Sequence, residues 1–389
     1  MTDSSMRLLI CAGGTGGGVY PAHAVLKALA EETNARPLLD TQPGVSILWV
    51  GSEGGMEADL VERVQVPYTA IPAAGVHGVG LRALPGNLLQ LWRGIWSSMR
   101  ILREFQPHVL LFTGGYVAVP MALAGRNTPT LLYVPDIEPG MALKFLARFA
   151  DRIALTAPES RDFFPSRTGL DVTGYPVRSD LHLWDLDKAR GALGLSADLP
   201  TLLVFGGSKG ARSINRALMA ELPQLLEDMQ IVHISGQLDW PNVQSAQTAL
   251  MSDENLSVEL VERYHPYPYL HSEMGAALTV ADLVLARAGA STLGEFPSFG
   301  LPAILVPYPH AWHYQAVNAS YLESHGAAVI LEDTALDEKL LSTVKELLGD
   351  HARMERMRRA MQSLAKPDAA YKISAILKEL RVGILQEGI

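Results

Sequence analysis

Three glycine-rich segments have the composition of loops that hold anionic groups. Each follows an apolar run and precedes a helix-like stretch; the three are Cys11–Gly18 (CAGGTGGG), Thr113–Tyr116 (TGGY) and Phe205–Ala211 (FGGSKGA). A glycine turn at the carboxyl end of a strand lets backbone N–H groups approach a ligand, and the positive end of the following helix favours an anion. Three such turns, spread over both halves of the chain, predict two nucleotide-binding folds that face each other across a cleft.

Other ligand chemistries fit the sequence less well. None of the glycine turns ends in the Gly-Lys-Ser/Thr of a P-loop, which argues against a nucleoside triphosphatase. The spacing in Gly13–Gly17 also differs from the dinucleotide-binding pattern, and no clear ribose-binding carboxylate occurs near residue 35. Asp185-Leu-Asp187 has the spacing of a metal-binding pair but precedes a helix-like stretch, so we expect helix capping there. We therefore expect neither a metal nor a cofactor.

Repeated strand–helix units must position these turns. Buried strands are predicted at Arg7–Ala12, Ser46–Gly51, Val109–Thr113, Thr130–Val134, Arg152–Thr156, Thr201–Phe205, Ile231–Ser235, Val258–Leu260, Leu283–Ala286 and Ala303–Val306. Continuous apolar strands that alternate with helices are typical of parallel sheets covered on both faces, which bind ligands beyond the carboxyl ends of their strands. We therefore predict an α/β fold with two Rossmann-like domains, at residues 1–180 and 181–366. The remaining segment, 367–389, is predicted as a helix able to pack back on the first domain.

Composition and charge narrow the class of protein. The chain has 389 residues, of which 48% are hydrophobic and 19% charged, as in a globular protein, and its net charge of −9 makes it a poor nucleic-acid binder. The single cysteine, Cys11, fits a reducing compartment and is expected to be buried at a strand end rather than to act as a nucleophile. Leu8–Ile10 is too short for the apolar core of a signal peptide, and no uncharged apolar run approaches the about 20 residues of a membrane span. We therefore expect a cytosolic protein.

The segment Leu81–Arg103 differs from the rest of the chain because it is rich in both basic and apolar residues. It carries four arginines, no acidic residue and two tryptophans, Trp92 and Trp96, and its apolar residues recur three and four positions apart, as in a helix. Pro85-Gly86 is expected to interrupt this helix near its start. One interpretation is an amphipathic helix packed on a sheet with its arginines in solvent. The other is a face that rests on an anionic membrane, with the tryptophans at the interface and the arginines near the head groups.

Several motifs, in their order and spacing, resemble those of the MurG family of glycosyltransferases, glycosyltransferase family 28. The resemblance extends over about Arg7 to Leu380 and rests on Gly13–Gly17, Gly114–Tyr116, Tyr175–Arg178 (YPVR), Gly206–Ala211, Arg287–Glu295 (RAGASTLGE), Gly300–Pro309 (GLPAILVPYP), Gln315 and Asn318-Ala319. The family transfers N-acetylglucosamine from UDP-N-acetylglucosamine to the undecaprenyl-linked acceptor lipid I. The resemblance implies the GT-B fold, with the donor on the second Rossmann-like domain and the lipid acceptor on the first.

The resemblance also implies roles for individual residues. Those it implies for substrate binding are Thr15, Gly16, Gly17, Tyr116, Arg178, Ser208, Ala290, Ser291, Thr292, Glu295 and Gln315. The N–H groups of Gly289–Thr292 would hold the UDP diphosphate without a metal, and Glu295 would accept hydrogen bonds from both ribose hydroxyls. Arg178 would contact the uridine or the diphosphate, and Gln315 would bind sugar hydroxyls. The alternatives are an exposed Glu295 favoured by the helix dipole and a linker role for Arg178.

The sequence departs from the family pattern mainly on the acceptor side. The family's first glycine turn normally ends in a histidine that is a proposed catalytic group, and this position is Gly18 here. The family's His-Glu-Gln-Asn segment aligns with Tyr133–Asp136 (YVPD), a later asparagine aligns with Leu143, and one of two sugar-binding glutamines aligns with Tyr314. These departures leave the identity of the catalytic base open.

Two acidic residues are the candidate catalytic residues. An inverting transfer needs a base that takes the proton from the acceptor hydroxyl while UDP leaves from the opposite face. Asp136 and Glu138 lie in the segment PDIEP, which follows a predicted strand, where active-site loops belong. The alternative is ordinary turn chemistry, because Asp beside Pro is a common loop signal.

The sequence therefore predicts an inverting N-acetylglucosaminyltransferase that makes lipid II from lipid I. Its partners would be UDP-N-acetylglucosamine, lipid I and an anionic membrane surface contacted through Leu81–Arg103, with no nucleic acid. We expect a peripheral location on the inner face of the cell membrane. The alternatives are a transferase for another lipid acceptor, a UDP-sugar epimerase, and a UDP-sugar-binding protein without catalysis.

Overall fold

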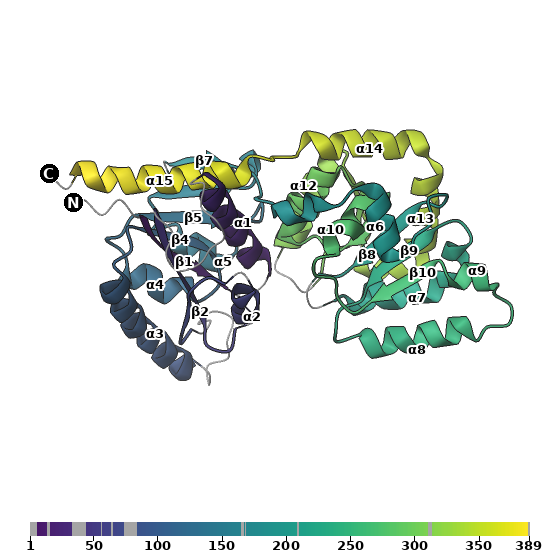
Figure 1. Cartoon of the computed structure of the whole chain (residues 1–389), viewed down its shortest axis with the longest axis horizontal. Coiled ribbons are helices and arrows are strands. Elements are labelled where there is room, and N and C mark those ends of the chain that lie inside the picture. Colours follow the sequence, from purple (N-terminus) through teal and green to yellow (C-terminus); the bar gives the residue numbers. More distant parts are fainter. Residues whose placement is uncertain are drawn as a thin grey trace. The chain divides into compact units, whose positions relative to one another are not determined.

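The chain folds into two compact α/β units (Figure 1). The computed structural model describes residues 6–13, 16–32, 44–55, 57–63, 65–73, 84–164, 167, 169–207, 210–309 and 313–387. Unit 1 contains Met1–Arg178 together with Pro367–Ile389, and unit 2 contains Ser179–Lys366. No helix in these described ranges has the length and apolar character needed to cross a membrane.

Unit 1 is built on a parallel sheet of seven strands. The strands are β1 (Met6–Ala12), β2 (Val45–Ser52), β3 (Tyr68–Ile71), β4 (Val109–Gly114), β5 (Thr130–Val134), β6 (Arg152–Leu155) and β7 (Leu170–Val172). Their order in the sheet is β3-β2-β1-β4-β5-β6-β7. All residues of β4 and β5 are buried, as expected for strands with helices on both faces.

Helices cover both faces of this sheet. They are α1 (Gly16–Glu32), α2 (Glu57–Glu62), α3 (Leu84–Phe105), α4 (Ala118–Ala124), α5 (Met141–Leu146) and the C-terminal α15 (Ala369–Glu387), with a 3₁₀ helix at Pro158–Phe163. Helices α1 and α15 pack together on one face, whereas α3 and α4 pack together on the other (Figure 1). Two polar contacts hold α15 in place: the Tyr371 hydroxyl donates to Glu31 at 2.6 Å, and Arg152 donates to Glu379 at 3.2 Å.

Unit 2 has a parallel sheet of six strands in the order β10-β9-β8-β11-β12-β13. The strands are β8 (Thr201–Phe205), β9 (Gln230–Ile234), β10 (Tyr264–Tyr267), β11 (Leu283–Ala286), β12 (Ala303–Leu305) and β13 (Ala328–Ile330). The α-helices are α6 (Leu186–Leu193), α7 (Arg212–Leu226), α8 (Trp240–Met251), α9 (Val258–Val261), α10 (Met274–Val280), α11 (Glu295–Phe299), α12 (Tyr314–Ser324), α13 (Leu336–Gly349) and α14 (His351–Ser363). Short 3₁₀ helices η2 (Ser179–Leu183), η3 (Ala290–Leu293) and η4 (Asp333–Ala335) join them.

Both sheets reverse their strand order at one point, and the glycine turns lie there. In unit 1 the reversal falls between neighbouring strands β1 and β4, which lead into the first and second glycine turns. In unit 2 it falls between β8 and β11, which lead into the third glycine turn and into Arg287–Thr292. Open parallel sheets bind ligands at such a switch point, beyond the carboxyl ends of the strands. The sheet topology therefore predicts one ligand-binding site in each unit, at its switch point.

Nine of the ten predicted strands are present within a residue or so of their predicted bounds, and one prediction is wrong. Val258–Leu260 lies in helix α9, because the Ser257 side chain accepts a hydrogen bond from the Leu260 N–H and caps a helical turn. The strand that follows is β10, which contains Pro266 and lies at the edge of the sheet, where a missing N–H is tolerated. The sequence analysis therefore missed four short strands, β3, β7, β10 and β13.

Two local predictions about helix ends have different outcomes. Pro85-Gly86 does not interrupt α3, because the helix begins at Leu84 and proline is tolerated in the first turn of a helix. The helix-capping interpretation of Asp185 is confirmed: its side chain accepts the Lys188 N–H at 2.9 Å at the start of α6. In the described part of the chain, no cluster of three or more His, Cys, Asp or Glu side chains is placed to hold a metal ion.

Candidate functional site

The first two glycine turns of unit 1 touch each other. Gly115 has φ +87°, and a Cβ atom added to it would lie 2.9 Å from the Gly13 carbonyl oxygen, so only glycine fits. The Thr113 hydroxyl, at the end of β4, donates a hydrogen bond of 2.6 Å to the carbonyl oxygen of Gly18 in the first turn of α1. The ends of β1 and β4 and the start of α1 therefore form one closely packed backbone surface.

The start of α1 can hold an anion at this surface. Gly16 and Gly17 are its first residues, and its first turn contains no acidic residue. The first N–H groups of a helix have no acceptor within the helix, and the helix dipole is positive there. Tyr116, after the second turn, is 55% exposed and so is available to a ligand. Thr15 lies outside the described residues.

Gly18 leaves room that a side chain can use. It is buried near the start of α1, and an added Cβ atom would lie 3.4 to 3.6 Å from Gly13 and Thr113, which is ordinary van der Waals contact. The backbone at this position therefore does not require glycine. The position where the family resemblance has histidine carries no side chain here, so any base in this unit must come from another residue.

A buried carboxylate that the sequence analysis missed lies beneath the first glycine turn. Glu57, the first residue of α2, is buried and accepts the N–H of Ser52 at 2.6 Å and its hydroxyl at 2.5 Å. A Cβ atom on Gly13 would lie 2.8 Å from its Oε1 atom. Burial, and secondarily the charge of Glu57, raise the pKa of the Cys11 thiol and raise that of Tyr68 to about 12. Cys11 is thus a buried, protonated strand-end residue, which confirms its predicted character.

The acidic loop after β5 carries both candidate bases. Asp136 and Glu138 are half-buried, whereas Pro135, Ile137 and Pro139 are buried. Glu138 forms an ion pair with Lys144, Nζ to Oε1, at 3.0 Å, so one of its oxygens is already occupied. Asp136 lies two residues after the end of β5, and its charge affects the pKa of Tyr133 in that strand.

Tyr133, near the end of β5, is a buried residue whose pKa is affected by several neighbouring groups. Burial raises the pKa of Tyr133 well above its ordinary value, a hydrogen bond with Thr156 opposes the shift, and the charge of Asp136 adds to it. The two hydroxyl groups are 2.8 Å apart, and Thr156 also donates to the carbonyl oxygen of Pro135 at 2.9 Å. The Tyr133 side chain therefore stays protonated and fixes the backbone that carries Asp136.

In unit 2, the third glycine turn lies tightly against the neighbouring strand end. Gly207 and Gly210 have φ of +86° and +75°, which favours glycine at both positions. A Cβ atom on Gly210 would lie 2.3 Å from the carbonyl oxygen of Ser235, just after β9. The turn leads into α7. Ser208, the predicted ligand residue in this turn, lies outside the described residues.

The segment after β11 forms a short helical turn. Ala290, Ser291 and Thr292 lie in η3, and the Thr292 hydroxyl donates to the Gly289 carbonyl oxygen at 2.7 Å. Ala290 and Thr292 are buried, whereas Ser291 is partly exposed. The three predicted diphosphate-binding residues therefore lie at the carboxyl edge of the sheet, directly beside the end of β8 that leads to the third glycine turn.

Glu295 and Gln315 are both held in defined positions. Glu295 is the first residue of α11 and is 8% exposed, so the interpretation of an exposed residue is wrong. Gln315, in the first turn of α12, accepts the Tyr308 N–H through its Oε1 atom at 2.9 Å. This bond uses the carbonyl oxygen of the Gln315 side chain, and its amide N–H₂ group has the polarity to donate to a ligand.

Arg178 contacts the helix that follows the first glycine turn. Its guanidinium group lies over the ring of Tyr20 in α1, 4.4 Å from the ring centroid. Cation–π stacking of this kind fixes the direction of the arginine. Arg178 is the last residue of unit 1, and the structure places it beside the start of α1.

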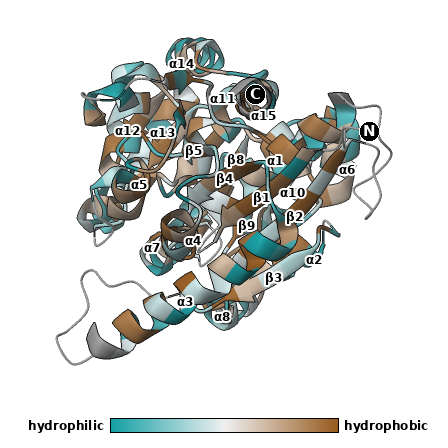
Figure 2. Cartoon of the chain, turned by 90° about the vertical axis from the view of Figure 1, so that its left-hand side faces the viewer, coloured by the Kyte–Doolittle hydropathy of each residue, from teal (hydrophilic) through white to brown (hydrophobic). Residues whose placement is uncertain are grey.

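The outer face of α3 is apolar and basic. Leu88, Leu89, Trp92 and Trp96 are each more than half exposed, and the two tryptophan rings lie 5.9 Å apart. Figure 2 shows brown, hydrophobic stretches along this helix. Arg93, Arg100 and Arg103 are exposed as well, although Arg100 pairs with Glu104 at 2.7 Å. Leu81 and Arg82 lie outside the described residues.

The inner face of α3 explains why the apolar side chains point outward. A Cβ atom on Gly94 would lie 2.4 Å from the carbonyl oxygen of Pro72, and Ser98 is completely buried. These small residues let the helix approach the end of β3 and helix α4 closely. The larger tryptophans and leucines on the opposite side therefore have no protein layer over them among the described residues of this unit.

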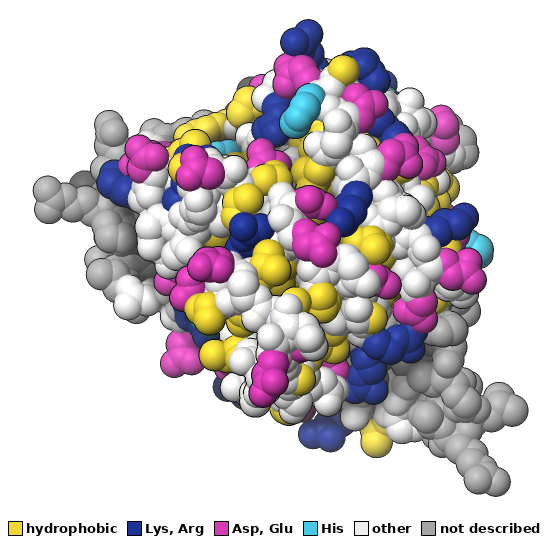
Figure 3. All heavy atoms as spheres, turned by 90° about the vertical axis from the view of Figure 1, so that its right-hand side faces the viewer, with side chains coloured by type: hydrophobic (Ala, Val, Ile, Leu, Met, Phe, Trp, Pro, Cys, Tyr) yellow, Lys and Arg dark blue, Asp and Glu magenta, His cyan; other side chains and the backbone are white. Residues whose placement is uncertain are grey.

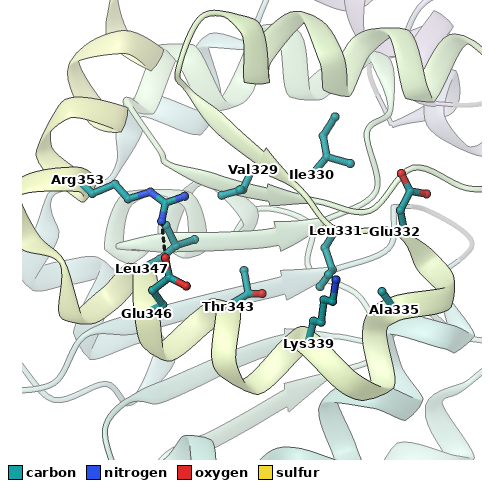
Figure 4. Close-up of a pocket in the computed structure, with 10 residues that line it drawn as sticks. All are labelled: Val329, Ile330, Leu331, Glu332, Ala335, Lys339, Thr343, Glu346, Leu347 and Arg353. Atoms are coloured by element: carbon teal, nitrogen blue, oxygen red, sulfur yellow. Dashed lines mark hydrogen bonds and ion pairs between the residues drawn. The ribbon is translucent and has the colours of Figure 1, made fainter.

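The surface of unit 2 has a different character. On the face shown in Figure 3, acidic and basic side chains are interspersed with polar and apolar ones across the coloured atoms. A hollow of about 250 Å³ lies beside the edge strand β13 (Figure 4). It is lined by Val329, Ile330, Leu331, Glu332, Ala335, Lys339, Thr343, Glu346, Leu347 and Arg353. No residue of the predicted donor or acceptor set lines it.

Comparisons with known proteins agree with this architecture. The family models "Glycosyltransferase family 28 N-terminal domain" and "Glycosyltransferase family 28 C-terminal domain" match residues 8–155 and 201–373. The crystal structure of Acinetobacter baumannii MurG is 25% identical in sequence, with a TM-score of 0.71, and the match covers 96% of this chain and 99% of that one. A putative UDP-N-acetylglucosamine 2-epimerase from Listeria monocytogenes shares the fold at a TM-score of 0.68 and 14% identity, over 95% and 94% of the two chains.

Two relatives carry the same descriptive name. The UDP-N-acetylglucosamine--N-acetylmuramyl-(pentapeptide) pyrophosphoryl-undecaprenol N-acetylglucosamine transferase of Roseiflexus sp. (strain RS-1) is 40% identical, and the match covers 96% of this chain and 95% of the relative. The transferase of that name from Bacillus subtilis (strain 168) is 32% identical, over 97% of this chain and 100% of the relative. The two parallel-sheet units match the GT-B fold, and the two family models identify the chain as a glycosyltransferase. The chain belongs to glycosyltransferase family 28 and, within it, to the MurG family.

Proposed function

We propose that this protein transfers N-acetylglucosamine from UDP-N-acetylglucosamine to lipid I, which gives lipid II for peptidoglycan synthesis. The observation that carries this proposal is the match, over nearly the full length of both chains, to relatives whose names state this reaction. The switch-point sites of the two units support it, because the reaction needs one site for each of two diphosphate-containing substrates.

The switch point of unit 2 has the groups that a UDP-sugar requires. The turn Ala290–Thr292 and the third glycine turn, with Ser208, would bind the diphosphate through N–H and hydroxyl groups. Glu295 would accept hydrogen bonds from the ribose hydroxyls, and the N–H₂ group of Gln315 would donate to the sugar. Arg178 would neutralise charge that develops on the leaving UDP.

The switch point of unit 1 suits the anionic part of the lipid acceptor. The N-terminus of α1, at Gly16 and Gly17, offers N–H groups and a positive dipole without a metal. Thr15 and Tyr116 would complete this acceptor site. The buried Glu57 side chain packs against Gly13 in this turn and would not contact the substrate.

Asp136 is our proposed catalytic base. It would take the proton from the attacking hydroxyl of the acceptor as the bond from the sugar to UDP breaks on the opposite face. Glu138, whose carboxylate pairs with Lys144 and which lies two residues farther along the loop from β5, is the second candidate.

The outer face of α3 would bring the protein to its lipid substrate. We propose that Leu88, Leu89, Trp92 and Trp96 enter the interface of an anionic membrane while Arg93 and Arg103 contact head groups. The protein would then be peripheral on the inner face of the cell membrane, and Arg82, outside the described residues, would belong to the same surface.

One assay tests the reaction directly. UDP release from UDP-N-acetylglucosamine is measured with and without a short-chain lipid I analogue, and the products are analysed by mass spectrometry. Release that depends on the analogue, with a disaccharide product, supports the proposal. Release that requires a different lipid, or UDP-sugar binding without any transfer, contradicts it.

A further inference from the structure

A buried arginine at the switch point of unit 2 joins segments that are far apart in the sequence. Arg287 directly follows β11 and is 9% exposed. One of its side-chain nitrogens, Nη1, lies 2.5 Å from Oδ1 of Asp333 in η4, and the other, Nη2, donates to the Ser213 hydroxyl at 2.7 Å. Ser213 lies in the first turn of α7, directly after the third glycine turn.

These three side chains form a closed set of hydrogen bonds. Ser213 accepts from Arg287 and donates to Oδ1 of Asp333 at 2.7 Å. Arginine can only donate, an ionised carboxylate can only accept, and a hydroxyl does both, so every bond has the required polarity. The negative charge of Asp333 balances the buried guanidinium, which keeps the arginine in one orientation.

The same arginine also fixes the loop between β12 and α12. Its Nη1 atom donates to the carbonyl oxygen of Val306 at 3.1 Å, and its guanidinium lies 5.2 Å from the centre of the Tyr308 ring. The Tyr308 N–H in turn donates to Oε1 of Gln315 at 2.9 Å. A continuous series of contacts therefore runs from Asp333 through Arg287 to a proposed sugar-binding residue.

The backbone beside Arg287 leads into the proposed diphosphate-binding turn. The completely buried Asn318 donates from Nδ2 to the carbonyl oxygen of Ala288 at 3.1 Å. The segment before Gly289 is thus held on one side by Asn318 and on the other by the Arg287 side chain. Movement of Arg287 would shift the start of α7, the turn Ala290–Thr292 and the loop that contains Tyr308.

We propose that Asp333 and Ser213 are positioning residues for the donor substrate, and that they act by holding Arg287. Together they set the relative placement of the three loops that bind UDP-N-acetylglucosamine. The inference rests on the proposed function, because it requires that this switch point is the donor site. This role would explain why an ion pair, rather than an apolar contact, is buried at the edge of the sheet. The hydrogen-bonded pair restricts the movement of loops whose backbone and side-chain atoms must face a ligand.

The chain contains a matched control for this ion pair. Arg216 and Asp337 also join α7 to the segment around α13, at 2.9 Å, but their side chains are 68% and 62% exposed. An exposed pair of this kind contributes little to the surrounding structure. Asp337→Asn therefore removes the same type of contact between neighbouring segments without reaching the loops of the switch point.

The test is equilibrium binding of UDP by calorimetry, followed by steady-state kinetics, on the full-length chain. We expect Asp333→Asn and Ser213→Ala each to weaken UDP binding and raise KM for UDP-N-acetylglucosamine by about tenfold or more. KM for the lipid I analogue should not change. Ser213→Thr, which keeps the hydroxyl, should restore UDP binding, and Asp337→Asn should bind UDP as the unaltered protein does.

The outcomes separate this inference from the proposed function. If the unaltered protein binds UDP and both variants bind it equally well, the inference is wrong and the donor site stands. An equal loss in Asp337→Asn, or a lower melting temperature with an unchanged UDP affinity, would also overturn it in favour of a purely structural role. If the unaltered protein does not bind UDP, the proposed function itself fails, and the inference fails with it. Arg287→Lys serves as a further variant, because it keeps the charge but loses the forked geometry.

Discussion

The Thr113 hydroxyl donates a hydrogen bond of 2.6 Å to the carbonyl oxygen of Gly18 and so joins the end of β4 to the first turn of α1 at the switch point of unit 1. The two residues come from different glycine turns. Because Thr113 is 2% exposed, water cannot replace this bond. The contact fixes how the start of α1, the proposed anion site, lies against the turn that carries Tyr116.

We expect Thr113→Val to lower the free energy of unfolding by about 1–2 kcal/mol, because valine has nearly the same shape but removes the buried hydrogen bond from the side chain to the Gly18 carbonyl oxygen. Urea denaturation measures this change. Thr113→Ser keeps the hydroxyl and is the control for the loss of the hydrogen bond. Equal stabilities of the Val and Ser variants would mean that the hydrogen bond does not contribute.

The positions of the glycine turns could be predicted from the sequence because each one follows a short, continuous apolar run. Such runs form the central strands β1, β4 and β8, in which nearly every residue is buried, and the residues after them must lie at the carboxyl edge of a parallel sheet. Edge strands were harder to predict. β10 contains proline and is only partly buried, and the segment before it, with Ser257 as its cap, forms a helical turn instead.

The polar contacts at the two switch points could not be predicted from sequence. Arg287 and Asp333 lie on different elements that only the sheet order brings together, and no local pattern marks them as a pair. Glu57 belongs to none of the motifs in the sequence, yet it lies buried beside Gly13. Such contacts depend on tertiary packing, whereas the motifs depend on adjacent residues.

The acidic loop after β5 leads to a prediction about catalysis. We expect Asp136→Asn to lower turnover by a factor of about 10² or more, because the amide cannot accept the proton of the acceptor hydroxyl. UDP binding should stay normal, since Asp136 belongs to unit 1 and the proposed donor residues of the sheet edge belong to unit 2. The measurements are kcat with the lipid I analogue and calorimetry with UDP.

Glu138→Gln is the matched control in the same loop. Glu138 lies two residues farther along the loop from the end of β5, so we expect a smaller loss of turnover than for Asp136→Asn. Unchanged turnover in Asp136→Asn would exclude it as the base. A larger loss in Glu138→Gln would transfer the assignment to Glu138.

The outer face of α3 leads to a prediction about membrane binding. We expect Trp92→Ala and Trp96→Ala each to weaken binding to vesicles that contain anionic lipid by roughly tenfold, because each removes a large side chain from the interface. Added salt should weaken binding further by screening the arginines. Cosedimentation with the vesicles measures both effects.

An exposed apolar residue of unit 2 provides the control. Leu238 is 76% exposed, and Leu238→Ala should leave vesicle binding unchanged. Binding that is insensitive to both tryptophan substitutions and to salt would exclude α3 as the membrane contact. Equal losses for Leu238→Ala would indicate a nonspecific hydrophobic effect.

A buried histidine in unit 2 leads to a prediction about pH. His233, in β9, lies between the Tyr264 hydroxyl, 2.8 Å from Nδ1, and Oδ1 of Asn215, 2.9 Å from Nε2. The Asn215 amide nitrogen donates to Asp239 and to the Ser235 carbonyl oxygen, so its Oδ1 atom is an acceptor and Nε2 of His233 carries the proton. Tyr264 then donates to Nδ1, and the histidine is neutral.

Burial lowers the pKa of His233 to about 3, although the charge of Asp239 partly opposes the shift. In the unfolded chain the pKa is about 6.5, so between these two values the unfolded state binds a proton that the folded state does not. The free energy of unfolding should therefore decrease as pH falls from about 6.5 toward 3, by up to about 1.4 kcal/mol per pH unit from this residue, and the contribution should be constant above pH 7. Urea denaturation at several pH values measures the slope.

His233→Gln is the matched variant, because glutamine can donate to Asn215 and accept from Tyr264 but does not titrate. We expect the stability difference between the unaltered protein and this variant to change by about 1.4 kcal/mol per pH unit between pH 6 and pH 4 and to be constant above pH 7. His182 and His265, whose pKa values are also lowered by burial, are present in both proteins, so their contributions cancel in the difference. A difference that does not depend on pH would mean that His233 accepts a proton in the folded state, and the hydrogen-bond arrangement derived from Asn215 would then be wrong.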